Sequence, residues 1–258
     1  MDIQALLNRI DETKALIDSH RPLRPEEAKE LDAYFRIGTT YSSNALEGNS
    51  LTLTETKVLL EDGLTAGGKP LRDCYEAVGH AKAYDFMLET ARGDLGFSED
   101  LILRLHGLFY LRLEPEMAGV YRDRQVFITG TEFVPPPAEK VPELMRAFVG
   151  ELNDVRECAH PVVLAAFAHR KLAGIHPFID GNGRTARLLM NLILVNSGYQ
   201  IAIIPPILRG AYINALKMTT RRHNPSDEAF VRLVAECEIE TQSDYCRLLG
   251  IRPSEKSD

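Results

Sequence analysis

The stretch of the chain that is best suited to chemistry is a short segment in its second half. It reads His176-Pro177-Phe178-Ile179-Asp180-Gly181-Asn182-Gly183-Arg184-Thr185-Ala186-Arg187. A histidine can accept a proton from a hydroxyl near neutral pH, because the ordinary pKa of its imidazole is about 6.5. A carboxylate beside a phosphate site calls for a bridging cation such as Mg²⁺, which prefers oxygen ligands. A base, a carboxylate and cationic groups in one short segment together predict attack by an alcohol on phosphorus.

The glycines and arginines of this segment predict a pocket for a polyphosphate. Gly181 and Gly183 allow the backbone to adopt positive φ and to turn its N–H groups inward, as an anion-binding nest requires. The segment then enters a helix N-terminus, which adds unpaired N–H groups and a partial positive charge. Arg184 and Arg187 are three residues apart, so both guanidinium groups can project from one face of the first turn. We therefore expect a ligand such as a di- or triphosphate.

Each of these features has an ordinary structural explanation when it is taken alone. A histidine before proline is usually structural, a Gly-Asn-Gly sequence is usually a turn, and an arginine pair usually lies on a solvated helix face. The whole pattern H-P-F-x-x-G-N-G-R-x-x-R is specific, because a chance match in a chain of this length has an expectation on the order of 10⁻⁸.

The elements that must position this segment are mostly helical. The expected helices lie at roughly 25–46, 52–62, 72–92, 98–113, 138–156, 160–175, 184–197, 207–221 and 226–248. The segment from Gln125 to Val134 differs, because β-branched and aromatic residues surround a glycine-containing turn and three prolines follow. It predicts a short β-hairpin. We expect one all-α domain that carries this hairpin and has an N-terminal helical extension.

Composition excludes several classes of protein. The chain has 258 residues, of which 45% are hydrophobic and 26% are charged, as in soluble globular proteins. Its net charge of −7 argues against nucleic-acid binding. No apolar run suits a membrane-spanning helix, and the first residues do not resemble a secretory signal. The cysteines lack metal-site spacing. We expect a cytoplasmic protein that binds neither nucleic acid nor membrane.

The segment from His176 to Arg187 resembles the signature of Fic-domain proteins, which typically transfer AMP from ATP to a serine, threonine or tyrosine hydroxyl of a target protein. The resemblance covers most of the chain, to about residue 240, and no position of the motif departs from the family pattern. It implies a Fic-fold helical bundle that uses ATP and Mg²⁺. It also implies a division into an N-terminal region (1–65) with an inhibitory helix (about 26–48), a Fic core (66–250) and a flexible tail (251–258).

The same resemblance implies a role for each residue of the motif. His176 corresponds to the general base, and Asp180 corresponds to the ligand of an Mg²⁺ ion bound to the α- and β-phosphates. Phe178 is similar to the family's buried phenylalanine, which anchors the loop. The residues expected to bind the nucleotide are Asp180, Gly181, Asn182, Gly183, Arg184, Thr185, Ala186 and Arg187.

The predicted hairpin also has a counterpart in the family. In Fic proteins a β-hairpin flap overhangs the site and pairs its edge with the backbone of the target, a contact that demands little of the target sequence. Here the flap is expected at about residues 124–134, with an unidentified target protein docked on it. A plain surface hairpin is the alternative. The residues expected to border the nucleotide are Thr129, Gly130, Thr131 and Glu132, with Tyr212 on the adenine side.

An upstream sequence, Ser43-x-x-x-Glu47-Gly48, resembles the inhibitory motif of the Fic class that carries its inhibitory helix in the same chain. A carboxylate held against Arg187 forms a charge-assisted pair and occupies donors that a γ-phosphate needs. ATP then binds with its α-phosphorus misaligned for in-line attack. We therefore expect an enzyme that Glu47 inhibits. Serine and glutamate four residues apart are also common on exposed helices, which is the alternative.

Several other functions stay open. Some Fic relatives remove AMP from a modified protein, and others transfer a phosphate or another nucleotide-derived group. A nucleotide-gated binding module that captures a partner without reaction belongs to a different class. A DNA-binding regulator with a winged helix is not expected, because only a short tail follows the last helical pattern. The target is not readable, and a homo-oligomer stays open because relatives often dimerise through helical surfaces.

Overall fold

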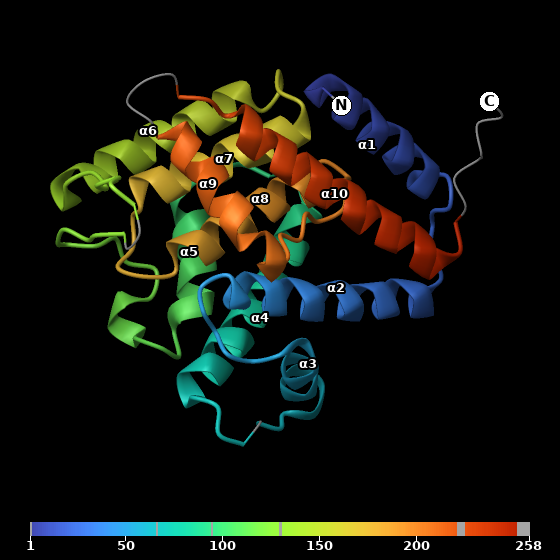
Figure 1. Cartoon of the computed structure of the whole chain (residues 1–258), viewed down its shortest axis with the longest axis horizontal. Helices are drawn as coiled ribbons and strands as arrows, with labels where there is room; N and C mark the ends of the chain where they lie inside the picture. Colours follow the sequence, from blue (N-terminus) through green and yellow to red (C-terminus); the bar gives the residue numbers. More distant parts are fainter. Residues whose placement is uncertain (1, 66, 94, 129–130, 221–224, 252–258) are drawn as a thin grey trace.

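The computed structural model is built from helices (Figure 1), and it describes residues 2–65, 67–93, 95–128, 131–220 and 225–251. Within these residues we find no β-strand, so the prediction of an all-α fold is confirmed. The α-helices are α1 (Ile3–Asp18), α2 (Pro25–Ala45), α3 (Leu53–Asp62), α4 (Leu71–Ala91), α5 (Glu99–Tyr110), α6 (Val141–Val155), α7 (Pro161–Ile175), α8 (Asn182–Asn196), α9 (Arg209–Thr219) and α10 (Glu228–Leu249). Short 3₁₀ helices lie at Pro115–Met117, Ala138–Lys140 and Pro206–Leu208.

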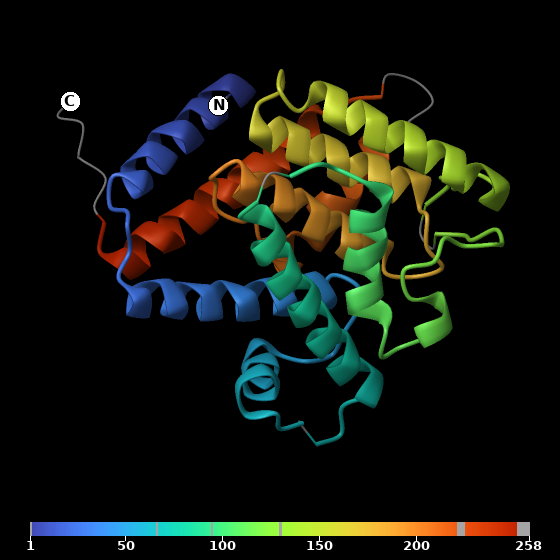
Figure 2. The same cartoon turned by 180° about the vertical axis from the view of Figure 1, so that it is seen from behind.

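Helix α8 is the central element of the fold. It packs against α7, α4, α5 and α2, and these helices surround it in both views (Figures 1 and 2). From residue 188 to 194 every side chain is buried and all but Asn191 are apolar, as is typical of a helix in the core of a domain. Arg184 and Arg187, which lie in its first two turns, are buried as well. The fold therefore buries two cations at the N-terminal end of its central helix.

The N-terminal helices are packed onto the rest of the molecule. Helix α1 lies beside α10 (Figures 1 and 2), and α2 packs on α4 while also touching α8 and α10. Ile251 is buried against Ile17 and Cys246, so the chain is still packed at the start of the expected tail. Residues 252–258 lie outside the described residues. Within the described chain we find no helix whose length and apolarity together suit a membrane crossing.

The expected β-hairpin is not shown. The described residues of the flap segment (124–134) form no strand, and Thr129 and Gly130 lie outside them. Side chains hold the main chain here in place of a strand ladder, because Gln125 Nε2 donates to the carbonyls of Val126 (3.2 Å) and Pro135 (2.9 Å). The prolines that follow have no N–H to give to a ladder.

Candidate active site

His176 ends α7 in a backbone conformation that is unusual for its residue type. Its φ is 53° and its ψ is 57°, which is the left-handed region. No other described non-glycine residue has a positive φ. Pro177 disfavours helical geometry at the residue before it, which explains why the helix stops here. Strained backbone of this kind persists where surrounding contacts hold it, and it is enriched at functional sites.

The ring of His176 is set up to accept a proton. Its Nδ1 lies 3.2 Å from the carbonyl oxygen of Ala173, so this nitrogen carries the hydrogen and Nε2 is the acceptor. Burial, aided by the charge of Arg122, lowers the pKa of His176, although Glu47, Asp180 and the Ala173 carbonyl act in the opposite direction. The imidazole is therefore neutral at pH 7.

The loop between His176 and α8 is shaped by an internal clamp. The side chain of Asn182 accepts from the N–H of Phe178 and donates to its carbonyl, both at 2.9 Å. Phe178 is fully buried and stacks on His106, with ring centroids 3.7 Å apart. The role expected for this phenylalanine in anchoring the loop agrees with that contact. The side-chain amide of Asn182 therefore uses its hydrogen bonds within the loop itself.

His106 is a second residue that supports the loop, and no sequence pattern points to it. It accepts from the N–H of Gly119 at Nδ1 (3.0 Å), so its Nε2 carries the hydrogen and donates to the carbonyl of Asp180 (3.1 Å). Burial lowers the pKa of His106 to about 4, which keeps the ring neutral and preserves both contacts. A neutral histidine in α5 thus sets the position of the loop backbone.

The N-terminus of α8 meets the end of α2 at very short range. Gly181, with φ 78°, precedes the helix, which begins two residues earlier than the sequence predicts. The N–H groups of the first turn have no partner within the helix. A Cβ on Gly183 would lie 2.2 Å from Glu47 Oε1, so only glycine leaves room for that carboxylate. The side chains of Thr185 and Ala186 are fully buried, and Thr185 Oγ1 donates to the carbonyl of Gly181 (2.9 Å).

All three nitrogens of the Arg187 guanidinium have partners. Nε donates to Ser43 Oγ (3.0 Å), and Nη2 donates to the Ser43 carbonyl (2.8 Å) and to Glu47 Oε1 (2.7 Å). Nη1 donates to the hydroxyl of Tyr212 (3.0 Å), which in turn donates to His169 Nε2 (3.1 Å). The predicted pairing of Glu47 with Arg187 is therefore present in the geometry, together with Ser43.

The charge of Glu47 is favoured by this arrangement. Burial raises the pKa of its carboxyl group, but the charge and the hydrogen bond of Arg187 outweigh that effect, and the net pKa lies below the ordinary value. Gly48 follows with φ 95°, which turns the chain away from α2. Glu47 is thus an anion at neutral pH, and it lies at the helix N-terminus where a phosphate is expected.

Asp180 has cationic neighbours on both of its oxygens. Oδ1 accepts from the N–H of Gly181 (2.6 Å) and from Arg184 (3.2 Å), and Oδ2 accepts from Arg72 (2.8 Å). Arg184 also lies 3.1 Å from Glu76. Neither Arg72 nor Glu76 has a motif-like spacing to the segment, so the sequence did not single them out. Both belong to α4, which packs on α8.

The donor set at Asp180 suits Mg²⁺ that is bound together with phosphates. Among the described residues, no group of three or more histidine, cysteine or acidic side chains could hold a metal ion by itself. Magnesium typically takes one or two carboxylates and completes its shell with water and substrate phosphate oxygens. Asp180, half-exposed beside the phosphate-facing helix end, fits that pattern.

A pocket is lined by some of these groups, whereas Asp180, Arg184 and Arg187 are not part of its lining. Its lining includes Glu47, His176, Gly183, Arg209 and Tyr212, and apolar side chains from α9 complete one wall. From the flap segment, Ile128, Thr131 and Phe133 also line it. Glu132 is exposed and is not part of the lining, while Thr129 and Gly130 lie outside the described residues.

Tyr212, which is expected on the adenine side, lies in the wall of this pocket. Its ring lines the pocket, but the residue is buried, and its hydroxyl is used by Arg187 and His169. The structure therefore brings together His176, Gly183, Arg187, Glu47 and Tyr212.

The comparisons with known proteins agree with this site. Residues 96–194 match the Fic/DOC family. A protein of Drosophila persimilis named protein adenylyltransferase Fic is 37% identical over 245 residues, which are 94% of this chain and 46% of that protein. The chain thus spans about half the length of this curated relative.

Solved structures extend the agreement to the fold. A single-substitution variant of Fic-1 from C. elegans has a TM-score of 0.84 and 30% identity, covering 96% of this chain and 72% of that one. A Fic domain containing signaling protein from Bacteroides thetaiotaomicron has a TM-score of 0.84 and 29% identity, covering 96% of this chain and 99% of that one. On the sequence motif, the site and these likenesses, the chain belongs to the Fic/DOC family.

Proposed function

We propose that the chain is a protein adenylyltransferase, which transfers AMP from ATP to a serine, threonine or tyrosine hydroxyl of a target protein. The observation that carries the proposal is that His176 and Gly183, at the N-terminus of α8, line one pocket together with Glu47, whose carboxylate is paired with Arg187. The name of the Drosophila relative supports it. The activity is proposed for the site in this chain, whatever else its longer relatives contain.

The reaction that suits this geometry is displacement at the α-phosphorus of ATP. The hydroxyl oxygen of the target forms a bond to that phosphorus, and the bond from it to the oxygen bridging to the β-phosphate breaks, so pyrophosphate leaves. The hydroxyl proton passes to Nε2 of His176, while Nδ1 stays bonded to Ala173. The N–H groups at the start of α8, with Arg184 and Arg187, bind the phosphates.

Asp180 is proposed to hold Mg²⁺ jointly with the α- and β-phosphates. When bound, the ion neutralises phosphate charge that develops during transfer. Arg72, which shares the carboxylate, adds a positive charge at the same edge of the site. ATP and Mg²⁺ are therefore the ligands that we propose.

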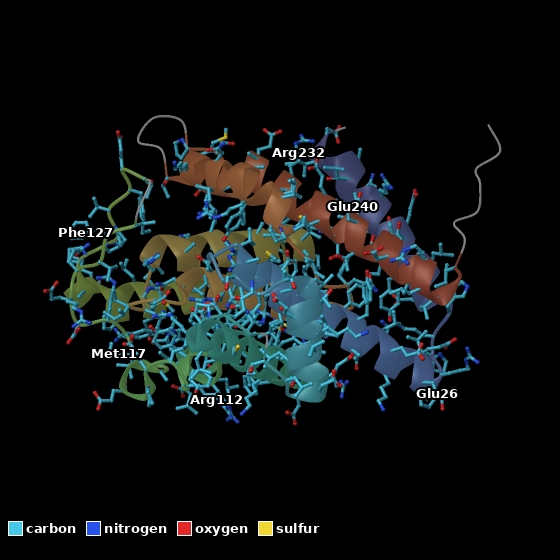
Figure 3. The ribbon with its side chains drawn as sticks, turned by 60° about the horizontal axis from the view of Figure 1, so that its bottom comes forward. Glu26, Arg112, Met117, Phe127, Arg232 and Glu240 are labelled. Carbon is cyan, nitrogen blue, oxygen red and sulfur yellow. The ribbon has the colours of Figure 1, made fainter. Side chains whose placement is uncertain are left out.

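Inhibition by Glu47 is part of the proposal. Its carboxylate is 2.7 Å from Arg187 and occupies the space beside Gly183, so it competes with a phosphate for the guanidinium and the helix end. In this proposal residues 1–65 form the inhibitory region and residues 66–250 form the core. The flap segment is proposed to pair with the backbone of an extended target segment, and Phe127, which is exposed on the outer edge of the molecule, lies in it (Figure 3).

The test compares transfer of label from ATP labelled at the α- or the γ-phosphate, measured as self-modification with Mg²⁺. We expect α-label to transfer, with Glu47→Gly raising the rate about tenfold or more. Glu47→Gln is expected to raise it less, because the amide oxygen still reaches Arg187. The matched control is Glu151→Gln, which neutralises a distant ion pair to Lys171 of the same 2.7 Å length.

The roles of the residues are tested in the Glu47→Gly background. His176→Ala is expected to lower transfer about 10²-fold or more while ATP still binds, because the base acts on the incoming hydroxyl. Transfer of γ-label instead of α-label would show a phosphotransferase. An unchanged rate in Glu47→Gly would remove the inhibitory role.

Removal of AMP from a modified protein is the second candidate function. The observation that favours it is that Glu47 and His176 line the same pocket, so a carboxylate can orient water there. If wild-type protein releases AMP from a modified target and Glu47→Gly does not, this is the main reaction. Mass spectrometry of the target distinguishes the two directions.

A further inference from the structure

Arg122 is a buried arginine that precedes the flap segment. Only 3% of it is exposed. Its guanidinium donates to three main-chain carbonyls: to His176 from Nε (2.8 Å), to Arg124 from Nη1 (3.0 Å) and to Pro136 from Nη2. Its own N–H donates to the carbonyl of Pro177 (2.9 Å). One side chain thus joins both ends of the flap segment to the turn that carries the histidine.

The partners of this arginine are dipoles rather than a carboxylate. Among the described residues no acidic group lies within ion-pair distance of Arg122. Burial lowers the pKa of its guanidinium, and the more distant Glu139 acts weakly against that effect. A buried cation without an ionic partner in contact with it is costly, so its short-range stabilisation comes from the carbonyls that it joins.

The carbonyl of His176 is the most informative of these partners. The N–H of His176 is bonded to the carbonyl of Leu172 (2.9 Å) and its Nδ1 to that of Ala173, so α7 holds one side of the residue. Arg122 holds the other side. Together these contacts stabilise a left-handed backbone conformation that a histidine rarely adopts.

We propose that Arg122 is a positioning residue that aligns the imidazole of His176 and closes the base of the flap segment at the same time. This inference rests on the proposed function, since His176 is the base in that proposal. The inference adds that Arg122 supports both the flap segment, on which a target is proposed to dock, and His176, the proposed base. The nucleotide phosphates meet α8, Arg184 and Arg187, which Arg122 does not contact in the structure. Loss of Arg122 therefore lowers the rate of transfer by a larger factor than it lowers ATP affinity.

The experiment measures kcat for self-modification and the Kd of ATP, both in the Glu47→Gly protein. Arg122→Met keeps the stem of the side chain and removes its donors, and we expect kcat to fall about tenfold or more, because small misplacement of a catalytic group is costly. Arg122→Lys keeps the charge but cannot span three carbonyls, so it is expected to lower kcat as well. Arg112→Met is the matched control, because Arg112 is exposed at the edge of the molecule (Figure 3).

Chemical rescue separates positioning from a general structural role. Arg122→Ala leaves a space lined by carbonyls, and added guanidinium ion at low millimolar concentration is expected to restore part of kcat, whereas the same concentration of sodium chloride is not. If Arg122→Ala fails to fold, the folded Arg122→Lys protein gives the result: an undiminished kcat overturns the proposal. Loss of ATP affinity in step with kcat overturns it too.

The proposed function and this inference fail in different ways. If the Glu47→Gly protein transfers no AMP, the proposed function is wrong, and the positioning role loses its basis. If that protein is active and Arg122→Met is equally active, the proposed function stands and the positioning role is wrong.

Discussion

At the scale of single residues, Arg187 shows how a buried cation is kept ready for an anion. Ser43 and Tyr212 contact it from two sides, and Glu47 provides the opposite charge. Because the first two contacts do not involve Glu47, removal of that carboxylate leaves the guanidinium oriented. His169 completes the chain of contacts and is kept neutral, since burial lowers its pKa well below the ordinary value.

Tyr212→Phe tests this arrangement. The substitution keeps the ring and removes the hydroxyl, so a donor of Arg187 and the acceptor nitrogen of His169 lose their partner inside the protein. We expect the free energy of unfolding to fall by about 1–3 kcal/mol, as measured by urea denaturation. Tyr34→Phe is the control, because Tyr34 is exposed and the hydrogen bond from its hydroxyl to Asp244 is long, at 3.4 Å. If the two substitutions lower the free energy of unfolding equally, the buried contacts of the Tyr212 hydroxyl do not stabilise the protein as predicted.

The residues of the motif could be predicted because they are close together in sequence and chemically distinctive. His106, Arg122 and Arg72 could not, because each is a single polar residue that reaches the site through the packing of another element. The contact of the Tyr212 hydroxyl with His169 of α7 could not be predicted either, because sequence spacing does not reveal it.

At the scale of elements, the N-terminal helices contribute differently to the site. Helix α2 carries Ser43 and leads into Glu47, whereas α1 packs on α10 away from the pocket. Ile10 of α1 is fully buried, and its carbonyl accepts from Gln242 Nε2 (3.1 Å). Helix α1 therefore stabilises the fold without touching the candidate site.

Ile10→Ala tests this separation of stability from binding. We expect the substitution to lower the free energy of unfolding by about 2–5 kcal/mol, because it leaves a cavity between two helices. The Kd of ATP, measured by calorimetry on the folded protein, is expected to stay the same. A large change in that Kd at a temperature where the protein is folded would show that α1 is coupled to the site.

The approximate positions of the helices could be predicted more closely than the residues at which they begin and end. The capping box Thr52–Glu55 begins α3 as expected, with Glu55 N–H donating to Thr52 Oγ1 at 3.2 Å. The helix expected at 98–113 ends at Tyr110, and those expected at 138–156 and 207–221 each open with a 3₁₀ turn. The flap segment was the least predictable element. Its main-chain carbonyl at Val126, and that of Pro135 just after it, accept from the side chain of Gln125 and not from a partner strand.

At the scale of the whole molecule, one buried acid governs part of the response to pH. Glu238 of α10 is fully buried, and its Oε1 accepts from the N–H of Gln200 (3.0 Å). Burial raises the pKa of this carboxyl well above its ordinary value, although the Gln200 contact acts against it. Its contribution to stability is complete below the unfolded pKa and is lost as pH rises toward the folded pKa.

Glu238→Gln is expected to remove this dependence. The amide oxygen can accept the same N–H, and the side chain no longer ionises. The variant should therefore gain stability relative to the wild type as pH increases from about 5 to 8, as seen in urea denaturation at several pH values. A gain that is constant over this range, or a loss that grows with pH, would contradict the inference.

The place of Glu47 along the chain bears on how the proposed inhibition would respond to nucleotide. Helix α2 ends at Ala45, so the carboxylate belongs to the turn that follows, and its side-chain torsions can rotate while every helical hydrogen bond of α2 stays intact. Carboxylate and triphosphate then exchange at the same guanidinium according to their relative affinities. We infer that the proposed inhibition is of a graded kind, which weakens as the ATP concentration rises and needs no unfolding of α2.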